Sequence, residues 1–160
     1  MSTHETELPF ANRLSDITSE ILSEVNPDRK DYLTPKVDRF AYSVSTEHIR
    51  GESGGNRSHK AETYVNTFGD DALDVIAIVL KERDTFDTWP DPDKRYLLDL
   101  ALGKKILSVE TGLLRAKARQ AYYGEADAGI TETTLTIQKL KGRQARLKER
   151  ATPSSPPMRR

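Results

Sequence analysis

The feature that most constrains this fold is residues 72–83, a segment that is apolar on nearly every side. A helix that is hydrophobic all round is normally buried, so other elements must surround it. The many β-branched residues also permit a buried strand. No second segment resembles a strand that could pair with it, and a lone strand is not stable by itself. We therefore predict an all-α protein in which this segment is the central helix of a small helical bundle.

Three stretches before the central segment repeat apolar residues at helical spacing. The first should end at Asn26-Pro27, because a proline disfavours helical geometry in the residue before it. Thr34-Pro35 has the composition of an N-cap followed by proline at the first helical position, so a second helix should begin there. The predicted helices lie at about 9–25, 35–50 and 59–68, with a glycine-rich loop at 51–57 before the third.

The second half of the chain should form a long helical hairpin. No proline interrupts residues 93–123, although Gly103 and Gly112 permit a kink, and one apolar stripe there can contain Leu97, Leu100, Ala101, Leu107, Leu114 and Ala118. After a turn at 124–129, a helix at about 131–150 has few apolar positions, namely Leu135, Leu140 and Leu147. Because an isolated helix is marginally stable in water, it should pack against 93–123 or against another subunit. The predicted parts are an acidic helical body at 1–92, a basic helical hairpin at 93–150 and a disordered tail at 151–160.

Acidic and basic residues are equally numerous, at 25 each, but they are unevenly distributed. Residues 1–103 contain 12 Lys and Arg and 20 Asp and Glu, a net charge of −8. Residues 104–160 contain 13 and 5, a net charge of +8. This division predicts either that a nucleic acid or acidic partner binds the basic end, or that the two halves attract each other.

The composition argues against several classes of protein. The chain has no cysteine, which excludes disulfides, thiolate metal sites and thiol nucleophiles. Its first ten residues include acidic side chains and lack the apolar core of a signal peptide. The longest apolar run, 75–80, is far shorter than the roughly 20 residues that span a membrane. We expect a cytoplasmic protein with no membrane contact, and no motif predicts a cofactor.

A dense group of cations near the C-terminus is the leading candidate for a binding site. Cations three or four residues apart share a helical face and could follow a phosphate backbone. A solvated helix face that folds against the acidic body accounts for the same pattern, and an acidic protein partner is a third possibility. The candidate residues, on two predicted helices, are Arg115, Lys117, Arg119, Lys139, Lys141, Arg143, Arg146, Lys148 and Arg150.

Asp70, Asp71 and Asp74 are weaker candidates for a metal site, because Mg²⁺ prefers carboxylate oxygens. The Asp71-x-x-Asp74 spacing before an apolar helix resembles the second metal-binding motif of the all-α nucleotide pyrophosphohydrolases, over about fifteen residues. Those enzymes also carry a Glu-x-x-Glu pair on an earlier helix, whereas Glu20 and Glu24 here are four residues apart. The alternative is that Asp70 and Asp71 cap the N-terminus of the central helix.

The loop at 51–57 leads into a helix N-terminus, where backbone amides can bind an anion. In that case Arg57, His59 and Lys60 would contact the phosphate or the partner. The loop lacks the spacing of a Walker motif and follows a helix rather than a strand, which favours a flexible connection. No pair of histidines has metal-ligand spacing, and no Ser-centred nucleophile motif is present.

Three functions are compatible with these patterns. The first, which we favour, is a non-enzymatic binding or assembly protein that acts through helical contacts and forms homo-oligomers through the hairpin. The second is a nucleic-acid-binding accessory protein that uses the basic C-terminal helix. The third is a Mg²⁺-dependent enzyme similar to the nucleotide pyrophosphohydrolases, acting through the aspartate cluster.

Overall fold

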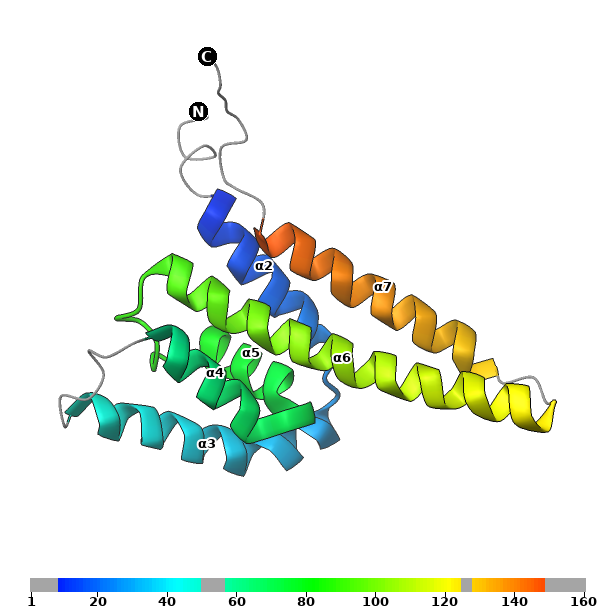
Figure 1. Cartoon of the computed structure of the whole chain (residues 1–160). Coiled ribbons are helices and arrows are strands. Elements are labelled where there is room, and N and C mark those ends of the chain that lie inside the picture. Colours follow the sequence, from blue (N-terminus) through cyan, green and yellow to red (C-terminus); the bar gives the residue numbers. More distant parts are fainter. Residues whose placement is uncertain (1–8, 50–56, 125–127, 149–160) are drawn as a thin grey trace, which may run out of the picture.

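The computed structural model describes residues 9–49, 57–124 and 128–148. Every regular element in these ranges is helical, so the protein is all-α, as predicted (Figure 1). None of the described helices is long and apolar enough to cross a lipid bilayer. The elements in chain order are α2 (Pro9–Ser23), α3 (Pro27–Ile49), α4 (Arg57–Phe68), the 3₁₀ turn η1 (Gly69–Asp71), α5 (Ala72–Glu82), α6 (Asp91–Tyr123) and α7 (Ala128–Lys148).

Helix α5 lies at the centre of the bundle, which confirms the prediction for the apolar segment. Helices α2, α3, α4 and α6 all contact it. From Ala72 to Val79 every residue of α5 is buried except Asp74. Burial of this apolar surface contributes hydrophobic stabilisation to the body at roughly 25 cal/mol per Å².

Helix α3 begins eight residues earlier than predicted, at Pro27 instead of Pro35. The Oδ1 of Asn26 accepts a hydrogen bond from the backbone N–H of Arg29 at 2.8 Å, so Asn26 is the N-cap and Pro27 occupies the first helical position. Pro35 lies inside the helix. The predicted start at Thr34-Pro35 was wrong because Asn26-Pro27 and Thr34-Pro35 both have the composition of a helix N-terminus.

An aromatic cluster packs the connection between α5 and α6, residues 83–90, against the bundle. Phe86 and Trp89 in this segment are 2% and 6% exposed. Their ring centroids are 4.7 Å apart in an edge-to-face arrangement. Phe86 also contacts Phe40 of α3 at 5.8 Å, and Trp89 stacks on Tyr64 of α4 at 6.5 Å. Trp89 is therefore a buried anchor for this connection.

The predicted hairpin consists of α6 and α7, which pack along each other (Figure 1). Helix α6 continues through Gly103 and Gly112 without a break and ends at Gly124. Gly124 has a φ of +71°, in the left-handed region that favours glycine, and its N–H donates to the carbonyl oxygen of Gln120 at 2.8 Å. Helix α7 covers 128–148, against the predicted 131–150, and also contacts α2.

Helix α6 is longer than the bundle that supports it. Its 33 residues extend about 50 Å, whereas the 11 residues of α5 extend about 16 Å. The N-terminal half of α6 packs on α4 and α5, and the distal half extends beyond them, accompanied by α7 (Figure 1). One hydrophobic cluster contains Val75 of the predicted body and Leu147 of the predicted hairpin, and the division at residue 92 stays a prediction. The predicted tail at 151–160 lies outside the described residues.

Candidate interaction surface on the helical hairpin

Arg143 of α7 is a buried cation that binds two carboxylates of α2. Its side chain is only 6% exposed. Its Nη1 and Nη2 donate to the two carboxylate oxygens of Glu24 at 3.0 and 2.6 Å, and its Nε donates to Glu20 Oε1 at 3.2 Å. Such a fork-to-carboxylate arrangement is among the stronger polar contacts in proteins. Arg143 therefore holds α7 against α2 and is not presented to solvent.

The neighbouring cations of α7 also have acidic partners within the chain. Arg146 binds Glu20, and Lys139 binds Glu24 at 3.2 Å. Hydrogen bonds from Arg146 lower the pKa of Glu20, and hydrogen bonds from Arg143 lower the pKa of Glu24, because both stabilise the ionised carboxylate. The opposite charges of the two chain halves therefore meet at the contact between α2 and α7.

Two further lysines of α7 face acidic residues of α6. Lys141 Nζ lies 3.0 Å from Glu110, and Lys148 Nζ lies 3.8 Å from Asp99. Arg95 of α6 donates to the carbonyl oxygen of Leu147 at 2.8 Å, which satisfies a backbone acceptor in the last turn of α7. The ninth predicted cation, Arg150, lies outside the described residues.

The three predicted cations of α6 are placed differently. Arg115, Lys117 and Arg119 are all exposed on the distal half of the helix. Within the described part of the chain, Arg115 and Lys117 form no ion pair. The eight described cations of the predicted nine are thus divided between α7, where they are matched by carboxylates, and α6, where positive charge faces solvent.

Between these cations α6 exposes apolar side chains at heptad spacing. Leu107, Leu114 and Tyr122 are 61%, 68% and 81% exposed. Five exposed residues follow one another along this face at intervals of four, three, four and three, and Tyr122 lies beside the last of them. We call these six residues the α6 stripe: Leu107, Thr111, Leu114, Ala118, Ala121 and Tyr122.

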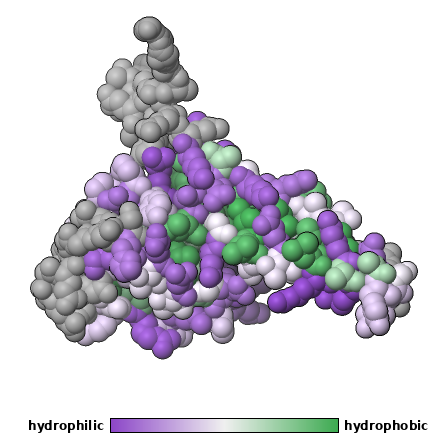
Figure 2. Space-filling model, viewed as in Figure 1, coloured by the Kyte–Doolittle hydropathy of each residue, from purple (hydrophilic) through white to green (hydrophobic). Residues whose placement is uncertain are grey.

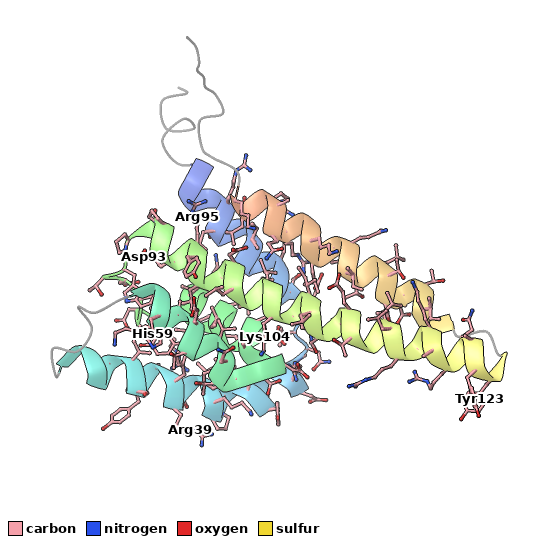
Figure 3. The ribbon with its side chains drawn as sticks, viewed as in Figure 1. Arg39, His59, Asp93, Arg95, Lys104 and Tyr123 are labelled. Atoms are coloured by element: carbon pink, nitrogen blue, oxygen red, sulfur yellow. The ribbon has the colours of Figure 1, made fainter. Side chains whose placement is uncertain are left out.

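Another face of α6 carries a second apolar series. Leu102 and Ile106 are buried, and Val109 packs partly buried against the core. These residues lie roughly 100–160° around the helix from Leu107, so the two series lie on different faces. Figure 2 shows hydrophobic atoms along the α6–α7 part of the visible face, bordered by hydrophilic ones. Tyr122 and Tyr123 form an edge-to-face pair, with centroids 4.8 Å apart, at the hairpin tip where Figure 3 shows Tyr123.

A groove of about 310 Å³ borders the α6 stripe where the helix leaves the bundle. Asp70 of η1 lies on one side of it and Lys104, Leu107 and Arg115 of α6 lie on the other, with Ser108 and Thr111. Figure 3 places Lys104 on the side of α6 that faces the bundle. The groove therefore combines one apolar side chain, Leu107, with charges of both signs.

Two members of the aspartate cluster, Asp71 and Asp74, are bound by cations of α3. Arg29 donates from Nη2 to Asp71 at 2.8 Å and from Nε to Asp74 at 2.9 Å, and Lys36 Nζ lies 3.3 Å from Asp71. Burial opposes the ionisation of Asp71, but hydrogen bonds from Arg29 and Lys36 outweigh it and lower its pKa.

No group of three potential metal ligands lies together among the described residues. Asp71 stands at the N-cap position of α5, but its side chain makes no capping hydrogen bond. The carboxylates that resemble a hydrolase motif therefore take part in the contact between α3 and α5.

The predicted anion-binding loop is only partly described. Arg57 begins α4, but its side chain lies outside the described residues, as does the segment 50–56. His59 is exposed in the first turn of α4 (Figure 3). Lys60 follows it in the same turn and is half-buried.

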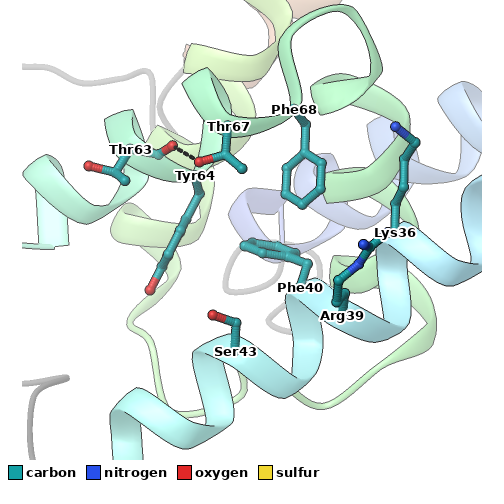
Figure 4. A pocket seen from close by; sticks show the side chains of 8 residues that line it. All are labelled: Lys36, Arg39, Phe40, Ser43, Thr63, Tyr64, Thr67 and Phe68. Atoms are coloured by element: carbon teal, nitrogen blue, oxygen red, sulfur yellow. Dashed lines mark hydrogen bonds between the residues drawn. The ribbon is translucent and has the colours of Figure 1, made fainter.

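Sequence reasoning missed a groove of about 530 Å³ between α3 and α4. Its floor consists of Phe40, Tyr64 and Phe68, and Figure 4 shows their rings between the two helices. Phe40 contacts the other two rings edge-to-face at 5.1 and 5.2 Å. The remaining lining residues are polar or cationic: Lys36, Arg39, Ser43, Thr63 and Thr67. Only the spacing of aromatic residues on two separate helices could have indicated it.

Comparison with known proteins identifies no relative: no family model, no curated protein and no solved structure matches this chain.

Proposed function

We propose that this protein is a non-enzymatic binding and assembly protein whose contact surface is the α6 stripe. The observation that carries the proposal is that α6 has two separate apolar faces, of which α7 and the bundle cover only one. A surface helix needs one apolar face to join its own fold. A second one, repeated at the spacing of a coiled-coil seam, is suited to a helix of another chain.

The side chains of the α6 stripe are large enough to stabilise such a contact. Full burial of one leucine or tyrosine contributes roughly 1.5–3 kcal/mol. Leu107, Leu114 and Tyr122 retain more than half of their exposure, so a covering helix would remove most of this surface from water. Isolated exposed leucines are common on proteins and need no explanation. Their recurrence on one face of a projecting hairpin supports a binding surface.

Site-specific photocrosslinking in cells that express the protein tests this function. A benzoylphenylalanine at Leu114 should form covalent adducts with a protein partner. The matched control is the same group at Tyr42, which is 74% exposed on α3 and remote from the α6 stripe. Adducts that form at position 114 and not at position 42 support the proposal. Absence of adducts at 114 would refute it.

The cations of distal α6 favour a second candidate, an accessory protein that binds nucleic acid. Arg115 and Lys117 are exposed, and neither forms an ion pair within the described residues. They can approach phosphates without breaking an ion pair, whereas Lys139, Arg143 and Arg146 would first have to leave Glu20 and Glu24. In this case Arg115→Glu with Lys117→Glu should abolish a salt-dependent shift with duplex DNA or RNA. Wild-type protein that gives no shift at about 50 mM salt would exclude it.

A further inference from the structure

The charges beside the α6 stripe identify a partner for it. We propose that the α6 stripe binds the α6 stripe of a second copy of this chain in antiparallel orientation, an inference that rests on the proposed assembly function. In heptad terms Leu107, Leu114 and Ala121 occupy d positions, and Thr111 and Ala118 occupy a positions. Glu110 and Lys117 are then the flanking g residues, and Ser108 and Arg115 the flanking e residues.

Antiparallel helices pair a with d positions, and one register joins large to small side chains. Leu107 faces Ala118 of the second copy, and Thr111 faces its Leu114, with the reciprocal contacts made across the two-fold axis. Each leucine thus meets a residue that leaves room for it, as a closely packed seam requires.

The same register also pairs opposite charges. In an antiparallel pair the g residues of the two helices face each other, so Glu110 of each copy lies beside Lys117 of the other. On the opposite flank, Arg115 meets Ser108 of the second copy at the groove that Asp70 lines. Lys117, which forms no ion pair among the described residues of the single chain, thereby acquires an acidic neighbour.

Other arrangements of two copies match these residues less well. A shift of one heptad places Lys117 against Lys117 and Arg115 against Arg115, which is repulsive. A parallel pair brings Glu110 close to Arg115, but it sets Thr111 against Thr111 and Ala118 against Ala118, and such small-to-small layers leave voids. The antiparallel register alone satisfies both the charge and the size pattern.

Charge-reversal variants test the antiparallel register, with the dimer dissociation constant measured by sedimentation equilibrium. Lys117→Glu should raise the dimer dissociation constant about tenfold, because two symmetric attractions become repulsions. Glu110→Lys should act similarly. The double variant Glu110→Lys with Lys117→Glu should restore association, because the exchanged charges again face each other across the interface.

An intrachain contact makes this restoration diagnostic. Glu110 binds Lys141 at 3.0 Å within the hairpin, and the double variant still lacks that ion pair. Recovery of the dimer by the double variant therefore reports a contact between copies and not repair of the hairpin. Far-UV circular dichroism of each variant checks that the helices are intact.

Each outcome decides the proposal. A different result is that Glu110→Lys with Arg115→Glu restores association and Glu110→Lys with Lys117→Glu does not. That result would establish a parallel dimer and overturn the antiparallel register. A wild-type mass of 18.0 kDa throughout the concentration series would overturn self-association. If adducts at position 114 nevertheless contain a different protein, the assembly function stands with another partner. If no adducts form at all, both proposals fail.

Discussion

Replacement of Arg143 by alanine tests whether α7 is held by its own body. The variant removes a guanidinium that binds Glu20 and Glu24 and leaves a gap between α2 and α7. Loss of one partner of a fully buried ion pair costs about 3–5 kcal/mol, and of an exposed pair about 0–1 kcal/mol. Arg143 is 6% exposed, but its partners are 39% and 45% exposed and can be hydrated. We therefore expect a loss of about 2 kcal/mol in the free energy of unfolding.

Urea unfolding followed by far-UV circular dichroism measures this loss. For a chain of this length, about 2 kcal/mol corresponds to a fall in Tm of roughly 4–8 °C. Lys139→Ala is the matched control, because Lys139 is 56% exposed and makes a single ion pair with Glu24. It should change the free energy of unfolding by less than about 1 kcal/mol. Equal effects of the two variants would refute the role assigned to Arg143.

The same contacts and the corrected helix boundaries lead to three further expectations. The lowered pKa values of Glu20 and Glu24 contribute stability that is complete above their unfolded pKa of about 4.3 and is lost as the pH falls through the lower folded values. The free energy of unfolding should therefore decrease below about pH 4.3, and less steeply in Arg143→Met, as acid titrations of the urea midpoint would show. Asn26→Ala removes the N-cap of α3 and should cost about 1 kcal/mol in urea unfolding, whereas Thr34→Ala should cost less. Phe40→Ala, at a side chain that is 4% exposed and contacts three other rings, should cost about 3–5 kcal/mol in the same assay.

The all-α architecture could be predicted because the strongest sequence signals are local. An apolar segment such as 72–83 has to be covered whatever its neighbours are, and helical periodicity identified the elements that cover it. The start of α3 could not be predicted in this way. Asn26-Pro27 and Thr34-Pro35 present the same chemistry, and only tertiary packing of the first turns of α3, including the buried Leu33, distinguishes them.

The candidate site shows where sequence reasoning stopped. Arg143 was a candidate for binding a nucleic acid or an acidic partner because of the cations around it, yet it lies in register with the buried residues Leu140 and Leu147. That spacing of three and four was a usable signal for a buried arginine. Its partners Glu20 and Glu24 had been considered only for their mismatch to a metal motif, since pairing between residues more than a hundred positions apart is not visible in one sequence.

Exposure of the α6 stripe likewise depends on how far α6 extends beyond the bundle, which the sequence does not reveal. Leu97 and Ala101 are buried, whereas Leu107 and Leu114, predicted to share their stripe, are exposed. Residues at heptad spacing rotate around an α-helix by about 20° per heptad. In addition, α6 is longer than the bundle and extends past its end. The periodic pattern is the same along the helix, but the body that covers its beginning does not reach its end.

The central claim, that two copies meet along α6, is tested most directly by distances between identical spin labels. Because the chain has no cysteine, a single cysteine at Ser108 or at Tyr122 can be labelled specifically. In the antiparallel register the two Ser108 positions are offset along the helix axis by about 14 Å and the two Tyr122 positions by about 28 Å. We expect pulsed dipolar spectroscopy to show the longer distance for Tyr122. Equal short distances at both positions, or no dipolar coupling at either, would contradict the account.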